Sequence, residues 1–240
     1  YVSDKIYTEE LEKIMPSFYG SIGIMLTLGG VLYGLFLLFS GVATVYKLLG
    51  LLLFFELIVV WTEINYLTAI KDYKGILLAF FFSMIAAFVI GYVLTYFKLP
   101  IITSLFFSVT VGYGIMMVWY LFLLLQYFSL GDGSSFSFLR WFDYYPEIAY
   151  VGTFINAGMF GHIVMMWFGP LGVHVQGLFY SAPGYDVPAL FSFISILITT
   201  INFMATVEVN FYPKYRNYFS LLNDRGSLKD IEEAEEEMLS

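Results

Sequence analysis

Apolar positions fall into six long runs along the chain, separated by short breaks that are charged or rich in glycine and proline. The runs cover about residues 18–40, 45–67, 75–97, 101–128, 148–168 and 187–207. A helix that crosses a hydrocarbon core of about 30 Å needs roughly 20 mostly apolar residues, and each run is long enough. The pattern therefore predicts an all-α integral membrane protein whose bundle has about six transmembrane helices.

Each break between the runs has a physical reason. Residues 71–74 include two lysines and an aspartate, which are costly in lipid, so the second run ends before them. A lysine and a proline within 98–100 separate the third run from the fourth, and 131–135 is a flexible polar turn. Gly169-Pro170 and Pro183-Gly184 are typical of turns and bracket the loop between the fifth and sixth runs.

The basic residues predict the orientation of the bundle. One side of the membrane would hold nine of them, in the two tails, the second loop and the fourth loop, whereas the other side holds only Lys47 and Lys98. Loops rich in lysine and arginine stay in the cytoplasm. We therefore expect a multi-pass protein of the bacterial cytoplasmic (inner) membrane with both chain ends in the cytoplasm. Its parts would be a cytoplasmic segment at 1–17, the six-helix bundle at 18–210 and a cytoplasmic acidic tail or loop at 211–240.

Composition supports lipid contact and excludes several classes of function. Of the 240 residues, 60% are hydrophobic and 12% are charged, whereas soluble domains carry about 25% charged residues. The absence of cysteine excludes disulfides, thiolate nucleophiles and cysteine-based metal sites, and two histidines are too few for a multi-histidine centre. The net charge of −8 argues against nucleic acid as a partner. We expect no cofactor and no metal. The chain begins with Tyr1, and we interpret it as an internal piece of a longer protein.

Two acidic residues within the second run are the most informative candidates, because burying a charge in lipid costs at least a few kcal/mol. Glu56 and Glu63 lie seven residues apart, which places them on one face of a helix. One interpretation is a polar stripe on a substrate path, able to bind a proton or a sugar hydroxyl. The other is that Glu56 is paired inside the bundle while Glu63 reaches the cytoplasmic end.

Three further polar residues within the runs are weaker candidates for the substrate path. Asn156 and His162 lie on the fifth run, and Asn202 lies on the sixth. A single histidine in such a position is more often a hydrogen-bonded packing residue. His174 and Asp186 belong to the loop between these runs, where a solvated loop is the favoured interpretation.

Three charged residues lie at the expected cytoplasmic boundary of the sixth run. Glu208 is followed by Lys214 and Arg216, so a local ion pair is the favoured role for this group. Further along, Ser227 with Asp230 three residues later resembles a capping box and predicts the start of a short helix. The acidic residues of that helix form either a solvated face or a docking site for a partner.

No motif predicts catalysis. The sequence has no G-x-x-x-x-G-K-[ST] phosphate-binding loop and no Ser/His/Asp arrangement in a recognisable setting. The longest loops, about 129–147 and 169–186, are short for the active site of a membrane-embedded glycosyltransferase. We therefore expect a protein that is not an enzyme and has no catalytic residue.

Two segments are distinctive enough to carry a family resemblance. They are Val2-Ser3-Asp4-Lys5-Ile6-Tyr7 with Ile14-Met15-Pro16-Ser17-Phe18-Tyr19-Gly20, and Thr206 to Tyr218 (TVEVNFYPKYRNY) followed by Leu222-Asn223-Asp224 and Gly226-Ser227. Together they resemble the PelG family of Pel exopolysaccharide exporters in the MOP (multidrug, oligosaccharidyl-lipid, polysaccharide) flippase superfamily. The similarity extends over the whole chain.

The resemblance implies a larger transporter than this chain. Members have about twelve spans, so two helices would precede Tyr1 and about four would follow Ser240. It also implies export of a growing, largely cationic amino-sugar polymer, with a cytosolic glycosyltransferase and membrane subunits of a Pel-type synthase complex as partners. It supplies no catalytic motif.

These observations lead to one hypothesis and two alternatives. The hypothesis is a subunit of an exopolysaccharide exporter, with alternating access or a gated passage, and proton coupling through Glu56 or Glu63 is part of it. A small-molecule secondary transporter would share the architecture and differ in cavity size. A membrane-embedded glycosyltransferase or polymerase is the weaker alternative because the loops are short.

Overall fold

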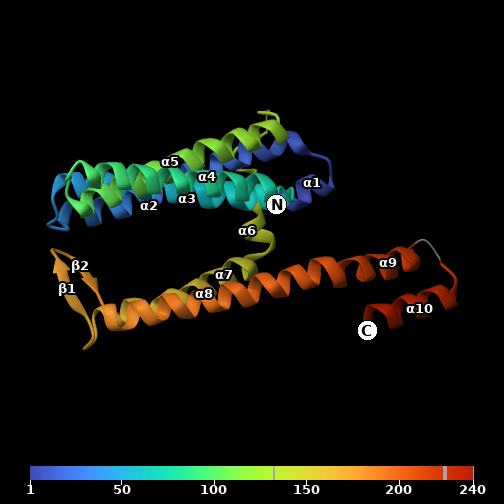
Figure 1. Cartoon of the computed structure of the whole chain (residues 1–240). Helices are drawn as coiled ribbons and strands as arrows, with labels where there is room; N and C mark the ends of the chain where they lie inside the picture. Colours follow the sequence, from blue (N-terminus) through green and yellow to red (C-terminus); the bar gives the residue numbers. More distant parts are fainter. Residues whose placement is uncertain (132, 224–225, 240) are drawn as a thin grey trace. The chain divides into compact units, whose positions relative to one another are not determined.

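The protein is an all-α membrane protein in its computed structural model, which describes residues 1–131, 133–223 and 226–239 (Figure 1). The side chains of Met204, Ala205 and Glu208 also lie outside this description. Within the described residues, six helices are long and apolar enough to cross a membrane. The predicted fold class is therefore confirmed.

The amino-terminal half consists of helices joined by short turns. In order they are α1 (Val2–Tyr7), the 3-10 helix η1 (Leu11–Lys13), α2 (Ile14–Phe39), α3 (Thr44–Ala69), α4 (Tyr73–Tyr96) and α5 (Ile101–Tyr127). These bounds lie within a few residues of the predicted runs. The largest difference is the start of α2, which begins at Ile14 because Pro16 is accommodated in the first turn, where a missing N–H costs little.

The second half contains the remaining elements. They are η2 (Ser137–Leu139), α6 (Arg140–Tyr144), α7 (Pro146–Trp167), β1 (Val173–Gln176), β2 (Phe179–Ser181), α8 (Pro183–Thr206), the π-helix η3 (Val207–Phe211), α9 (Tyr212–Asn223) and α10 (Leu228–Leu239). Pro183-Gly184 was expected to form a turn, and this is wrong. Pro183 is instead the first residue of α8, a position that suits its fixed φ and lacking N–H.

The chain divides into two units, described separately here. The first comprises residues 1–161 with 174–180, and the second comprises 162–173 with 181–240. The division expected from sequence, at residues 17 and 210, concerns sides of the membrane and stays a prediction.

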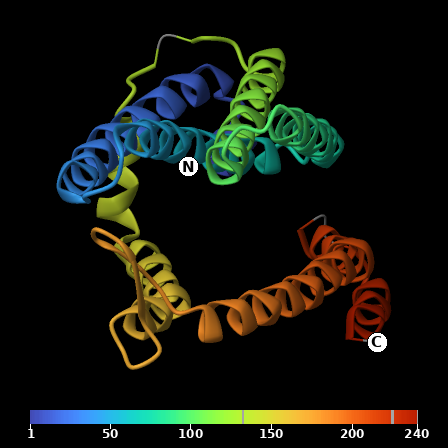
Figure 2. The same cartoon turned by 60° about the vertical axis from the view of Figure 1, so that its left-hand side comes forward.

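In the first unit, α2 to α5 run side by side, and both views show this arrangement (Figures 1 and 2). Helix α3 packs against α2 and α5, and α5 also packs against α4. The buried core lies where these helices meet the amino-terminal segment. It includes Ile14, Phe18, Leu67, Tyr120 and Leu124.

Helices α3 and α4 end in the same way. In each, the chain turns through a lysine with positive φ, Lys71 at 61° and Lys98 at 59°. The amides of Asp72 and Leu99 then bond back to the carbonyls of Leu67 and Leu94. This is a Schellman motif, in which glycine is the usual residue. After α3, helix α4 begins directly, because the Asp72 carboxylate caps its first turn by accepting the Gly75 N–H at 3.0 Å.

The amino-terminal segment is held by a cluster of charges. Glu10 pairs with Lys5 and, at 2.5 Å, with Lys13. Hydrogen bonds from Lys13 and Lys5 lower the pKa of Glu10 to about 2. The same segment is tied to α6 and η2, since Tyr1 contacts Ser137 at 2.7 Å and the Trp141 ring at 6.0 Å.

The β1–β2 hairpin was not expected from the sequence. Its turn bonds to the α2–α3 turn, because the Leu178 amide donates to the Ser40 carbonyl at 3.0 Å. Gly177 has φ +58° and approaches Gly41, whose φ is +74°. The Phe179 ring packs edge-on against Phe36 at 5.3 Å.

In the second unit, α8, η3 and α9 follow directly on one another and form one continuous helical segment, and α10 packs back against α9 (Figure 2). Ser227 caps α10 as predicted, accepting the Asp230 N–H at 3.2 Å. The carboxylate of Asp186 accepts the Trp167 indole N–H at 3.1 Å and the Ala182 N–H at 2.8 Å. Asp186 therefore belongs to the first turn of α8 and not to a solvated loop.

Apolar side chains cover most of the outer surface of the spans. In the most apolar windows of α7 and α8 no residue is buried, and in that of α5 only 28% are. In a soluble protein this surface would be a severe aggregation hazard. Lipid or further protein must cover it, which identifies a multi-pass membrane protein.

Candidate functional site

Four polar side chains line the contact between α3 and α5, and we refer to Glu56, Glu63, Tyr113 and Tyr120 as the polar seam. Both pairs are spaced by seven residues, so each pair occupies one face of its helix. Helices α3 and α5 pack closely along their lengths. The seam therefore places two carboxyl groups and two phenols between helices that are mostly apolar.

Glu63 is the most deeply buried ionisable group of the seam. Its exposed fraction is 0%, and it shares the inner face of α3 with Val60 and Leu67. Neither carboxyl oxygen has a hydrogen-bond partner within the described residues. The expectation that Glu63 reaches the surface at the end of the helix is therefore wrong, because the core closes over it.

Glu56 lies two turns away, near the middle of α3. Its exposed fraction is 6%, and its Oε2 atom has no hydrogen-bond partner in the described part of the chain. Its Oε1 atom lies over Gly114 of α5, where a Cβ atom would stand 3.1 Å away. Glu56 is therefore buried inside the bundle as expected, but the expected partner is not seen for its Oε2 atom.

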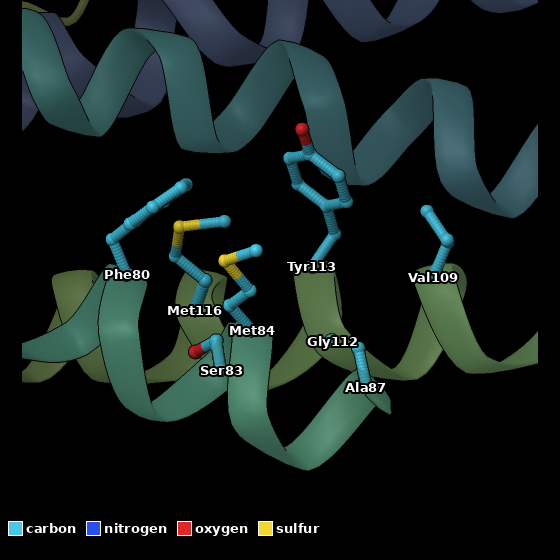
Figure 3. A pocket seen from close by; sticks show the side chains of 8 residues that line it. All are labelled: Phe80, Ser83, Met84, Ala87, Val109, Gly112, Tyr113 and Met116. Atoms are coloured by element: carbon cyan, nitrogen blue, oxygen red, sulfur yellow. The ribbon is translucent and has the colours of Figure 1, made fainter. Parts of the chain in front are cut away.

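The two tyrosines bring hydroxyl groups to the seam from α5. The Tyr120 hydroxyl donates to the Ile76 carbonyl of α4 at 3.0 Å, and its ring is fully buried. Glu63 lies within electrostatic range of this phenol. Figure 3 shows the Tyr113 ring rising from α5 toward the ribbon of α3.

A hollow of about 240 Å³ between α4 and α5 adjoins the seam through Tyr113, which lines both (Figure 3). The walls are mostly apolar, and the buried Ser83 hydroxyl has no partner among the described residues. The lining residues are Phe80, Ser83, Met84, Ala87, Val109, Gly112, Tyr113 and Met116.

The electrostatics of the seam are set by the helices around it. Neither α2 nor α5 carries a charged residue, so no cation on them neutralises the two acids. Isolated charges in a low-dielectric interior are very costly, and such groups become neutral instead. In the described part of the chain no group of three or more His, Asp or Glu could hold a metal ion. The seam is therefore suited to bind a proton, an amine or a hydroxyl group.

The other predicted path residues lie elsewhere, each with its own local contacts. Asn156 is exposed on α7 and donates to the Gly152 carbonyl at 2.8 Å. His162 is half-buried on α7, where its ring lies 5.8 Å from Tyr185 and 6.2 Å from Phe193. Asn202 is exposed on α8. Their roles on a substrate path stay predictions.

The three residues expected at the cytoplasmic boundary, Glu208, Lys214 and Arg216, lie on η3 and α9. Lys214 is half-buried and Arg216 is exposed on α9. The side chain of Glu208 lies outside the described residues, so the ion pair expected there stays a prediction.

Sequence reasoning missed the two tyrosines of the seam and Gly114. The signal was available, because Tyr113 and Tyr120 repeat the seven-residue spacing of Glu56 and Glu63. Two apolar helices that each carry a pair of polar residues seven positions apart have polar faces that can pack against each other. Aromatic residues are so frequent in this chain, at 21%, that the two tyrosines did not stand out.

Comparison with known proteins supplies the family. The family model PelG, described as "Putative exopolysaccharide Exporter (EPS-E)", matches residues 1–240. No curated protein and no solved structure matches the chain. The match covers every span and both segments that carried the resemblance. Because this family model matches the chain over its whole length, the chain belongs to the PelG family.

Proposed function

We propose that the chain belongs to an inner-membrane transporter subunit that exports a Pel-like exopolysaccharide across the cytoplasmic membrane. The observation that carries this proposal is the match of the PelG exporter family to all 240 residues. Export of this kind moves a polymer without breaking or forming covalent bonds, so the protein would not act as an enzyme.

The chemistry of the bundle supports a passage for an amino-sugar polymer. Aromatic rings stack on sugar rings and attract cations through their faces. The seam adds Glu56 and Glu63, which could accept hydrogen bonds from hydroxyl or amine groups. Since most of the apolar surface of α7 and α8 is unburied, further helices or lipid would complete the passage.

The charge distribution supports the proposed orientation. With both ends in the cytoplasm, the nine bases of the tails and even loops face inward. The segment of α1 and η1 and the acidic helix α10 would then face the cytosolic glycosyltransferase and the membrane subunits of the synthase complex. These are the partners that we propose for the polar ends of the chain.

The test is polymer secretion in cells that lack the full-length parent gene, with cell-associated and secreted polysaccharide measured separately. We expect secretion to stop while lysate still makes polymer from nucleotide sugar. Restoring the gene should restore secretion. Unchanged secretion in the deletion strain would refute the proposal and favour a small-molecule transporter, and loss of synthesis in lysate would point to a polymerase.

A further inference from the structure

We propose that Glu63 is a proton-binding site, and that a proton released from it toward the cytoplasm is coupled to outward movement of the polymer. The coupling rests on the proposed export function, whereas the proton site rests on the structure of the seam. The carboxyl group binds a proton when the seam is closed and loses it when helix movement admits water.

Burial and missing partners carry the first step of the argument. Glu63 has an exposed fraction of 0%, and neither of its oxygens is hydrogen-bonded within the described residues. An ionised carboxylate in such a place would lack both water and a counter-charge. The protonated acid avoids most of this cost, so the burial of Glu63 and its missing partners favour the protonated form.

The elements packed against α3 offer nothing that would neutralise Glu63 in another way. They are α1, α2, α4 and α5. Helices α2 and α5 carry no charged residue, Lys74 of α4 is exposed, and Lys5 of α1 is bonded to Glu10 beside Asp4. The other titratable groups of the seam region are Glu56, Tyr66, Tyr113 and Tyr120, which are acids or phenols and supply no positive charge.

The neighbouring phenol fits a protonated acid. The Tyr120 hydroxyl uses its hydrogen on the Ile76 carbonyl at 3.0 Å, which leaves its oxygen as an acceptor. An ionised carboxylate near this oxygen is unfavourable, whereas a neutral carboxyl group is tolerated there without a hydrogen bond between the two groups.

The position of Glu63 along α3 allows exchange with water at one end of the bundle. It lies six residues before the last residue of α3, Ala69, or roughly 9 Å along the axis at 1.5 Å per residue. When the O–H bond of Glu63 breaks, a water molecule takes up the proton as hydronium, and reprotonation from hydronium forms that bond again. The proton arrives from the outer side, along the seam past Glu56, and leaves to water on the cytoplasmic side.

The proton site can be tested without any assay of transport. Dicyclohexylcarbodiimide reacts with protonated carboxyl groups in apolar surroundings, so we expect it to modify Glu63 of the full-length protein in membranes. Mass spectrometry should show more modification at lower pH, while the exposed Glu12 stays unmodified. Infrared spectroscopy of the same protein should show a protonated-carboxyl band that E63Q removes. A spectrum whose band is the same in E63Q would overturn the proposal.

Coupling is tested by variants in the parent protein. Glutamine has the shape and charge of the protonated acid, so E63Q should fold and reach wild-type abundance, yet secrete polymer only at the level of the deletion strain. E63D should restore part of the secretion, and E147Q, which alters an exposed acid at the start of α7, should match the wild type. Wild-type secretion by E63Q would refute coupling while leaving export intact. Secretion that survives deletion of the gene would refute export but not the infrared result.

Discussion

The carboxyl group of Glu56 on α3 lies directly over Gly114 on α5. A Cβ atom at position 114 would stand 3.1 Å from Oε1 of Glu56, closer than most side-chain contacts in proteins. The missing side chain lets the two helices approach at the point where one of them carries a buried acid. Small residues serve this purpose widely in membrane helix packing.

Substituting Gly114 by alanine should loosen this contact. The added methyl group forces the Glu56 side chain to shift, and overpacking of this kind costs about 1–3 kcal/mol. We expect G114A to lower the thermal unfolding temperature of the full-length protein in detergent. G23A is the matched control, because a Cβ atom at Gly23 meets nothing within 4 Å. Equal unfolding temperatures for both variants would show that the seam is less tightly packed than described.

The end of α4 offers a substitution that should stabilise the protein. Lys98 has φ +59°, a conformation that costs an L-residue about 1–2 kcal/mol and glycine almost nothing. K98G should therefore raise the unfolding temperature, whereas K98A keeps the strain and should not. The comparison is made by thermal unfolding of both variants in the same detergent. A gain for K98A equal to that for K98G would assign the effect to the lost charge.

Sequence patterns predicted the spans well because lipid imposes a length on each helix. The end of α3 shows what they could not predict. Charges at 71–74 indicated that the helix stops, but not that Lys71 adopts positive φ to complete a Schellman motif. Glycine is the usual signal for this motif, and it is absent at both lysine positions.

The charge cluster of the amino-terminal segment predicts a pH dependence. The pKa of Glu10 is about 2 in the folded protein and 4.5 without these contacts. A lowered folded pKa means that the ion pairs contribute fully above about pH 4.5 and are lost as the pH falls toward 2. A spin label at T8C, in a chain without other cysteines, should keep its mobility from about pH 7 to 5 and gain mobility only as the pH falls to about 2.

Substitution of Glu10 should remove this dependence. In E10Q the label at position 8 should be mobile at every pH, because the glutamine amide leaves Lys5 and Lys13 without a carboxylate. E12Q alters an exposed acid of the same segment and serves as control. A label that stays immobile in E10Q would show that the contacts of Tyr1 with Ser137 and Trp141 hold the segment instead.

The candidate site divides into a part that sequence predicts and a part that depends on packing. The spacing of Glu56 and Glu63 was sufficient to place them on one face. Which helix faces them was not deducible, since α4 and α5 are both apolar and rich in aromatic residues. The burial of Glu63 depends on how Phe18 and Leu67 close the core, and this is a property of the folded chain.

Tyr66 links α3 to α2 inside that core. The Ser17 hydroxyl donates to the Ile14 carbonyl at 2.7 Å, so Tyr66 is the donor in its 3.1 Å contact with Ser17. Y66F removes this hydrogen bond and keeps the ring contact with Phe18 at 5.3 Å, which should cost about 1 kcal/mol.

A larger change at the same position separates the two contributions. Y66A also removes the ring, and such truncations cost about 3–5 kcal/mol. Unfolding of both variants of the full-length protein in denaturant measures the difference. Equal losses for Y66F and Y66A would mean that the hydroxyl, and not the ring, holds the two helices.

The contact between the β1–β2 hairpin and the α2–α3 turn determines which sequence changes this region can tolerate. Its central bond joins two backbone groups, the Leu178 amide and the Ser40 carbonyl, at a place where Gly177 meets Gly41. Most side-chain replacements on the hairpin would leave that bond intact. Adding or deleting a single residue in either turn would shift it out of register. A Cβ atom at position 177 would meet the Ser40 carbonyl oxygen itself. The lengths of both turns and the two glycines are therefore what must be held fixed when tags or reporters are inserted here.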